Sequence, residues 1–259
     1  MKRAVSDVAA SAAGESFTDV VYGQLKADIL WGRLSPGEAL RSEELRRRYD
    51  IGISPLREAL TRLASEQLVI RLPQKGFRVA TLDAAEVNDV LETRLIVEGE
   101  ALRLSMARGD IEWESGILVA SHALGRALQD TALKPETPEW SAVHRRFHLS
   151  LLSGCKSPTL LHFAEILYDR AERHRMVGET WRARVESSGA VAGRNRAGEH
   201  ETISQFVLAG DFNQAMEALR RHYMLTAQSV LHVLGYKDSA TGEGTKAAPA
   251  KAGLRKGAA

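Results

Sequence analysis

Apolar residues recur at helical spacing along most of this chain. After Ser16 they stand at positions 17, 21, 25, 29 and 30, which share one face of an α-helix. Ser16 and Asp19 form a pair typical of a helix start, because each side chain can bond to the other residue's backbone amide. The pattern therefore predicts an amphipathic helix that begins at Ser16 and ends before Gly32.

Two more helices are expected before residue 70. Ser42, followed by two glutamates, favours the start of a short helix that ends at Tyr49. Ser54 is expected to be the N-cap of a third helix, with Pro55 as its first residue and its end near Gln67. This third helix carries an inward-facing apolar stripe at the i, i+4, i+7 spacing, formed by Leu56, Leu60 and Leu63.

A β-hairpin should follow the third helix. The runs 68–72 and 77–82 have the composition of β-strands and surround a turn at Gln74–Gly76. Three helices followed by a hairpin is the order of a winged helix-turn-helix, which we therefore predict over residues 16–82.

The rest of the chain shows helical patterns and no convincing strand. Asp83 with Glu86 predicts the start of a long helix that ends near Arg108, and Asp211 predicts the start of a last helix that reaches about Leu234. Two further helix starts are marked by threonine–proline and serine–proline pairs at 137–138 and 157–158.

These elements predict a mainly α protein with two domains. The winged helix-turn-helix at 16–82 is followed by an all-α antiparallel helical bundle at 83–235. The ends, 1–15 and 236–259, lack the apolar residues that a packed core needs and are expected to be disordered tails.

The composition is that of a soluble folded protein, with 44% hydrophobic and 26% charged residues. A single cysteine, Cys155, excludes a disulfide framework and suits a reducing compartment. The N-terminus begins with two basic residues but has no leucine-rich segment, and no apolar run approaches the length of a membrane span. We expect a cytoplasmic protein that does not contact membranes.

A net charge of +2 means that any nucleic-acid surface must come from local clusters of cations. Residues 16–81 hold eleven Lys/Arg and eight Asp/Glu, a difference of +3. The third helix of a winged helix-turn-helix presents its first turn to the major groove, while cations nearby meet phosphates. The alternative is an ordinary basic surface. The candidate DNA-binding residues are Arg41, Arg46, Arg47, Ser54, Arg57, Lys75 and Gly76.

Four of the eight histidines form the second candidate site. His144 and His148 are four residues apart, so on a helix they share one face. With His200 and His222 they would offer four neutral imidazoles, which suit Zn²⁺, Ni²⁺ or another divalent transition metal. Arg145 stands where a zinc protease has its catalytic glutamate. The alternative is that these histidines are surface residues or satisfied core residues.

The first domain resembles the DNA-binding domain of the GntR family of bacterial transcription regulators. The resemblance rests on LKADILWGRLSPGEAL, on LRRRYDIGISPLREALTRLASEQLV and on QKGFRVATL, and covers about residues 17–82. It implies that Arg57 contacts DNA and that Gly76 lies in the wing near a minor groove. The chain departs from the family where Gly52 and Ile53 replace the usual Ser-Arg.

The second domain resembles the FCD ligand-binding domain of the FadR-type branch of that family, over about residues 84–232. The resemblance rests on RLIVEGEALRLSMARGD, FHLSLLSGCKSPTLL and EHETISQFVLAGDFNQAMEALRRHYMLT. It implies that His148, His200 and His222 bind a metal, with His144 in the place of the family's aspartate. The combined features look closest to the carbon-starvation-induced subgroup that controls glutarate and lysine-breakdown genes.

The resemblance also implies a cavity for a small carboxylate or dicarboxylate effector next to the metal. Arg94 is our candidate for binding the far end of such a ligand, since a guanidinium can hold a carboxylate with two hydrogen bonds. The alternative is that Arg94 only pairs with Glu98, one helical turn away.

From these features we expect a dimeric, ligand-responsive repressor that binds a palindromic double-stranded DNA operator. Two other classes of function stay open at this point. One is a metal-dependent enzyme that acts on a small organic acid, although no catalytic carboxylate or nucleophile motif accompanies the histidines. The other is a metal-stabilised helical scaffold that binds a partner protein.

Overall fold

The computed structural model describes residues 16–135, 137–184 and 194–236. The chain divides between Leu82 and Asp83 into two compact units, each with its own hydrophobic core. The tails expected at 1–15 and 236–259 lie outside the described residues, apart from Tyr236. Within the described residues, no helix is both long enough and apolar enough to span a bilayer.

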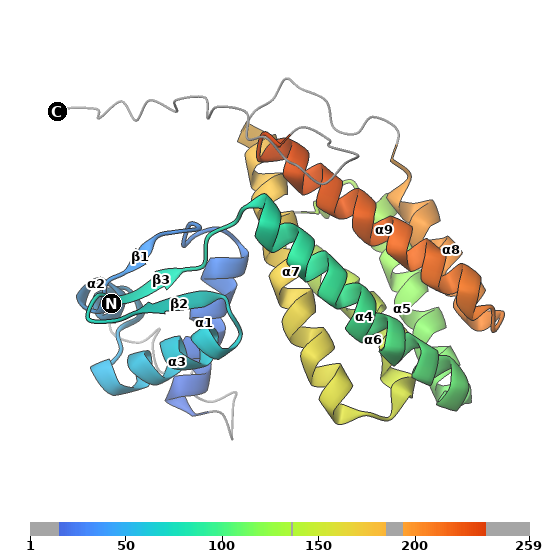
Figure 1. Cartoon of the computed structure of the whole chain (residues 1–259), viewed down its shortest axis with the longest axis horizontal. Helices are drawn as coiled ribbons and strands as arrows, with labels where there is room; N and C mark the ends of the chain where they lie inside the picture. Colours follow the sequence, from blue (N-terminus) through green and yellow to red (C-terminus); the bar gives the residue numbers. More distant parts are fainter. Residues whose placement is uncertain (1–15, 136, 185–193, 237–259) are drawn as a thin grey trace. The chain divides into compact units, whose positions relative to one another are not determined.

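Over residues 16–82, the first unit contains three helices and a small antiparallel sheet (Figure 1). The helices are α1 (Phe17–Leu30), α2 (Ser42–Tyr49) and α3 (Ile53–Ser65). The strands are β1 (Ala39–Leu40), β2 (Val69–Leu72) and β3 (Gly76–Val79), in the spatial order β1-β3-β2. The predicted winged helix-turn-helix order is confirmed, and both hairpin strands are slightly shorter than expected.

The start of α3 differs from the prediction. The helix begins at Ile53, with Gly52 as an N-cap that makes no side-chain hydrogen bond, so the assignment of Ser54 as N-cap is wrong. Pro55 is therefore the third helical residue and not the first. The first four amides of a helix have no acceptor within the helix, so a proline at this position sacrifices no hydrogen bond.

The predicted apolar stripe of α3 is confirmed. Leu56, Leu60 and Leu63 are each at most 1% exposed, and they belong to the same core cluster as Leu25 and Ile29 of α1. At the edge of this core, Asp28 of α1 accepts three hydrogen bonds that join α1 to α2 and to the loop after α1. Their donors are Arg33 (2.5 Å), Arg48 (2.7 Å) and Tyr49 (2.5 Å).

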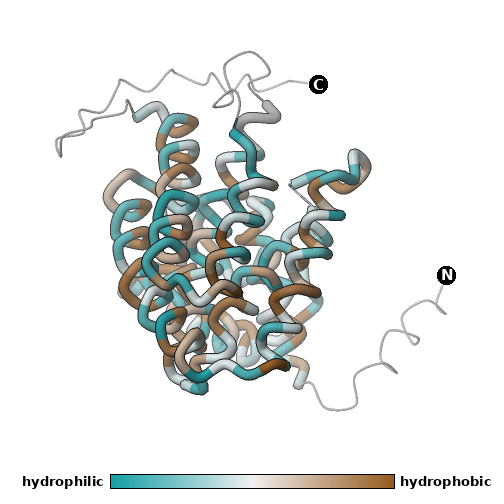
Figure 2. Tube along the Cα trace, turned by 90° about the vertical axis from the view of Figure 1, so that its right-hand side faces the viewer, coloured by the Kyte–Doolittle hydropathy of each residue, from teal (hydrophilic) through white to brown (hydrophobic). Residues whose placement is uncertain are grey.

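Among its described residues, the second unit contains helices and no strand, as predicted. Its helices are α4 (Ala84–Arg108), α5 (Ile111–Gln129), α6 (Pro138–Leu152), α7 (Pro158–Arg184), α8 (Arg196–Leu208) and α9 (Phe212–Val233), with a short 3-10 turn η1 (Ser153–Cys155) before α7. Hydrophobic and hydrophilic residues alternate along these helices (Figure 2), as expected of helices that each bury one face.

Side-chain caps begin several helices of this unit where they were expected. Asp83, Thr137 and Asp211 each accept a hydrogen bond from the backbone amide three residues later. Asn195 caps α8, so His200 lies one turn inside this helix.

Replacement of Asp28 by asparagine should destabilise the first unit by about 1–3 kcal/mol, because two guanidinium groups and a tyrosine lose a charged acceptor. Hydrogen exchange of peptides from residues 16–82 in the full-length chain measures this effect. Asp50→Asn is the matched control, since Asp50 is exposed at the end of α2. Equal exchange in the two variants would contradict the structural role of Asp28.

Candidate metal centre and DNA-binding surface

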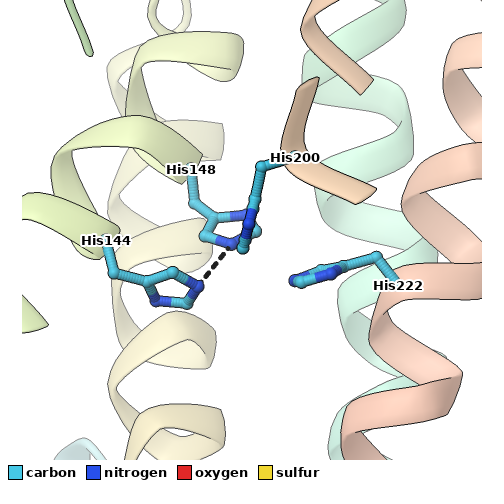
Figure 3. A group of neighbouring side chains, drawn as sticks. All are labelled: His144, His148, His200 and His222. Atoms are coloured by element: carbon cyan, nitrogen blue, oxygen red, sulfur yellow. Dashed lines mark hydrogen bonds between the residues drawn. The ribbon is translucent and has the colours of Figure 1, made fainter. Parts of the chain in front are cut away.

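The structure brings the four candidate histidines together. His144 and His148 come from α6, His200 from α8 and His222 from α9, and all four are at least 93% buried. One ring nitrogen of each lies within 4.8 Å of those of the other three. Figure 3 shows the rings gathered around a common centre between their helices.

Each ring is held from outside through its Nδ1 atom, which leaves Nε2 to face the centre. The Nδ1 atoms of the four rings have four different partners. These are the Tyr168 hydroxyl for His144 (2.9 Å), the Tyr223 hydroxyl for His148 (3.4 Å), the Arg196 carbonyl for His200 (2.7 Å) and the Glu199 carboxylate for His222 (2.8 Å). Outer partners of this kind orient metal-binding histidines in proteins.

The partners of His200 and His222 fix the tautomers of these two rings. A carbonyl and a carboxylate only accept hydrogen bonds, so both rings donate through Nδ1 and keep a lone pair on Nε2. Burial raises the pKa of Glu199, but hydrogen bonds from Arg194 and His222 outweigh burial and lower that pKa to about 2. Glu199 is therefore ionised and acts as an acceptor at neutral pH.

A tyrosine hydroxyl sets the tautomer of His148. Tyr223 donates its proton to Glu98 at 2.5 Å, so only its oxygen is left to accept from Nδ1 of His148. His148 therefore keeps its lone pair on Nε2, which lies 3.1 Å from Nε2 of His144. In the absence of an ion, His144 carries its proton on Nε2 and accepts from the Tyr168 hydroxyl through Nδ1.

Burial keeps all four imidazoles neutral. It lowers the pKa values of His144 and His148 well below the usual 6.5, and the charge of the neighbouring rings lowers them further. Burial also lowers the pKa of His200, to about 3. The pKa of His222 is lowered by burial too, although its hydrogen bond to Glu199 opposes the shift.

These atoms fit a divalent transition-metal ion. Nε2 of His200 is buried and has no hydrogen-bond partner among the described residues, and an ion would satisfy it. The 3.1 Å between Nε2 of His144 and Nε2 of His148 matches the roughly 3.0–3.4 Å between neighbouring ligands bound at about 2.0–2.1 Å. Neutral nitrogen donors suit zinc or nickel, whereas magnesium and calcium prefer oxygen.

The histidines line a cavity that also contains arginines which the sequence analysis missed. Its volume is about 50 Å³, counted as the space open to the centre of a water molecule. Since one water needs about 10–15 Å³ on this measure, the cavity has room for roughly three to five waters. The arginines in its wall are Arg94, Arg175, Arg194 and Arg196.

Every one of these four arginines is paired with a glutamate. The pairs are Arg94–Glu98 (2.6 Å), Arg175–Glu172 (2.5 Å), Arg194–Glu199 (2.7 Å) and Arg196–Glu179 (2.8 Å). Only the first pair has a signal that the sequence analysis used, the i, i+4 spacing. The pairing means that the arginines add little net positive charge to the cavity.

Arg94 pairs with Glu98 one helical turn away, the alternative to a role in effector binding. Its Nε and Nη2 atoms donate to the two carboxylate oxygens of Glu98, and its guanidinium lies over the Tyr223 ring, 3.8 Å from the ring centroid. The Glu98 carboxylate raises the pKa of Arg94 despite its burial. A two-bond grip on an effector through these nitrogens would require Glu98 to release them.

In the first unit, the candidate DNA-binding cations divide into two groups. Arg41, Arg47, Arg57 and Lys75 are exposed and form no ion pair within the described residues, although Arg47 donates to a backbone carbonyl. Arg46 pairs with Glu43 at 3.1 Å.

The other two candidates lie beside these cations. Ser54 is exposed in the first turn of α3, and Gly76 begins β3 with a φ of +83°, a left-handed conformation that favours glycine in the tip of the wing.

Three other cations of this unit have structural contacts instead. Arg48 is bound to Asp28, Arg62 pairs with Asp19 and covers the Tyr22 ring, and Arg78 donates to the carbonyl of Gly37. Besides Arg78, the exposed cations that form no ion pair among the described residues of this unit are Arg41, Arg47, Arg57, Arg71 and Lys75.

Comparison with known proteins identifies the family. Residues 17–79 match the family described as bacterial regulatory proteins, gntR family, and residues 89–224 match the FCD domain. The chain belongs to the gntR family of bacterial regulatory proteins, and the resemblance seen in the sequence is confirmed. It is a transcription regulator with an FCD effector-binding domain and not an enzyme.

Curated relatives agree with this assignment. The HTH-type transcriptional repressor GlaR of Escherichia coli K12 is 36% identical over 203 residues, which cover 78% of this chain and 90% of GlaR. The regulator BphR of Paraburkholderia xenovorans LB400 is 34% identical over 209 residues, which cover 80% of this chain and 82% of BphR.

Solved structures share the fold. McbR/YncC of Escherichia coli has a TM-score of 0.66 at 21% identity and covers 85% of this chain and 97% of its own. A putative GntR regulator from Rhodococcus sp. RHA1 has a TM-score of 0.62 at 19% identity, with 83% and 97% of the two chains covered.

Because the buried imidazoles are neutral, we expect metal-free protein to become less stable as the pH is lowered. Below pH 6.5 the histidines of the unfolded chain take up protons, whereas the buried histidines of the folded protein stay neutral. The free energy of unfolding therefore decreases as the pH falls toward the folded pKa of His200, about 3. Between pH 7 and 5, His200 alone should account for about 2 kcal/mol of lost stability.

Urea unfolding of the chelator-treated protein at several pH values measures this loss. His200→Gln should remove part of the pH dependence, whereas His162→Gln, on an exposed histidine, should not. The same pH dependence in both variants would show that His200 is not held neutral.

Proposed function

We propose that this regulator is a homodimeric repressor that binds a palindromic operator and releases it when a small carboxylate binds beside a metal in the second unit. The observation that carries this proposal is the convergence of four neutral imidazoles on one small cavity. The relative GlaR is named a transcriptional repressor, which supports repression rather than activation. We infer from this DNA-binding role that the protein acts in the cytoplasm.

The metal would be held by His144, His148, His200 and His222, with zinc or nickel as the ions that suit four imidazoles. Such an ion polarises and binds carboxylate oxygen when it is present. The protein's own part is to keep the rings neutral and oriented. The outward hydrogen bonds through Nδ1 and the burial of the rings do this.

The size and charge of the cavity support a small anionic effector. Its free volume suits a ligand of a few heavy atoms. Since the arginines in its wall are already neutralised by glutamates, the ion would supply the unbalanced positive charge that attracts a carboxylate. We propose Arg94 as a further contact of the effector, through Nη1, the terminal nitrogen that Glu98 does not bind.

The unit at 16–82 is the proposed DNA-binding domain. The first turn of α3, with Ser54 and Arg57, would enter the major groove, while Arg41, Arg46 and Arg47 would meet phosphates. Lys75 and Gly76, at the tip of the wing, would lie along the adjacent backbone or minor groove.

The unit at 83–235 is the proposed effector-binding and dimerisation domain. Exposed apolar side chains support its role in dimerisation, among them Ile96 (73%), Leu118 (56%) and Phe163 (51%). A dimer would place two α3 helices on two half-sites of the operator. The effector would act by binding more tightly to the dimer geometry that fits the operator less well.

Metal-depleted wild-type protein without a histidine tag should bind about one zinc or nickel ion per chain and unfold at a higher temperature once it is loaded. His144→Ala combined with His148→Ala should weaken this binding by about 100-fold or more, because half of the ligands are lost. Isothermal titration with each metal salt measures the affinity.

The matched control is His122→Ala combined with His162→Ala, which removes two exposed histidines from the same unit. The control should bind metal as the wild type does. Equal affinity in the two double variants would contradict the proposed centre.

Arg57→Ala should lower the affinity for operator DNA by about tenfold, since a base or phosphate contact of arginine is worth about 1–3 kcal/mol. Fluorescence anisotropy with DNA from directly upstream of the neighbouring genes, between 50 and 200 mM salt, is the measurement. Arg62→Ala is the control, because Arg62 is paired with Asp19. A larger loss for Arg62→Ala than for Arg57→Ala would contradict the orientation of α3.

A further inference from the structure

The first turn of α3 presents an isoleucine to solvent. Ile53 is the first residue of the helix, and 47% of it is exposed. The core of this unit does not use it, since the buried stripe of α3 consists of other residues, Leu56, Leu60 and Leu63. A single exposed aliphatic residue is ordinary on a protein surface. Any functional inference about Ile53 must therefore rest on where it lies.

The position of Ile53 is on the face of α3 that carries the available cation. Arg57 follows four residues later, so the two side chains are neighbours on one face of the helix. Ser54, exposed in the same turn, lies beside them. Farther along the unit, Arg41 and Lys75 are exposed without an ion pair among the described residues. An aliphatic side chain thus stands within a polar, cationic surface that suits DNA.

We propose that Ile53 is a specificity-determining residue that contacts the C5-methyl group of a thymine in the major groove. This inference rests on the proposal that the first turn of α3 enters that groove. An isoleucine has no donor or acceptor for phosphates or for the polar edges of bases. The thymine methyl is the apolar group that base pairs display in the major groove, and it is the group that an aliphatic side chain recognises.

The side chain is also suited to a fixed contact. A β-branched residue in a helix has one strongly preferred χ1 rotamer, so Ile53 loses little conformational freedom when it meets a base. Arg57 would anchor the same turn to an adjacent base or phosphate by charge. Together they predict an operator half-site with thymine at one position, opposite adenine, where cytosine is disfavoured because it lacks the methyl.

Replacement of thymine by deoxyuridine tests this contact, because it removes the methyl and keeps every hydrogen-bonding group of the base pair. The probe is a duplex selected from a random pool by the purified full-length protein. Each thymine of this duplex is then changed to deoxyuridine in turn. In the wild type, one thymine in each half-site should show about fourfold weaker binding, the effect of one buried methyl group.

Ile53→Ala should bind the unmodified operator more weakly and lose the discrimination at that thymine, so that thymine and deoxyuridine duplexes bind alike. Ile53→Val, which keeps the branched carbon, should retain it. The matched control is Ile70→Ala on β2, which removes the same side chain at 41% exposure from the same unit. This control should discriminate as the wild type does. Circular dichroism and thermal unfolding check that each variant is folded.

The proposal is overturned if no thymine is sensitive to loss of its methyl, or if the sensitive thymine stays sensitive in Ile53→Ala. A different failure belongs to the underlying proposal. If the protein enriches no sequence from the random pool, the entry of α3 into the major groove is contradicted, and base reading by Ile53 falls with it.

Discussion

The sensing half of this regulator depends on hydrogen bonds that hold four imidazoles from outside. Each ring has its Nδ1 atom engaged, and three of the partners are committed acceptors: the Arg196 carbonyl, the Glu199 carboxylate and the Tyr223 oxygen. His148, His200 and His222 therefore direct Nε2 lone pairs toward the centre, while Nε2 of His144 carries a proton that it donates to His148 when no ion is bound. A cation bound there would take a lone pair from all four rings, with the proton of His144 on Nδ1.

The second constraint is charge balance around this centre. The arginines in the wall of the cavity are each paired with a glutamate, so their charges are nearly balanced before any ligand arrives. An ion would then dominate the local field, and an anion would bind mainly to it. Since α4, α6, α7, α8 and α9 all contribute to the cavity, a ligand there contacts most of the bundle. Because a bound ligand contacts several helices, it can shift the packing of all of them at once.

The sequence predicted what local spacing determines and missed what tertiary contacts determine. The pairing of His144 with His148 follows from helix geometry alone, whereas the partners of His144, His148 and His222 lie on other helices and leave no local signal. Strand β1, two residues long, has no periodicity to detect. Ser54 looked like a cap because serine before proline is a common helix start, yet the exposed Gly52 serves as well in an extended conformation.

The most direct test of the metal centre is X-ray absorption at the metal edge of the zinc-loaded protein. We expect about four nitrogen neighbours at about 2.0–2.1 Å, with the outer-shell scattering of imidazole rings. A carboxylate effector added to the sample should contribute an oxygen neighbour. A spectrum with few or no imidazole contributions would place the ion elsewhere and contradict the claim that these four rings form its site.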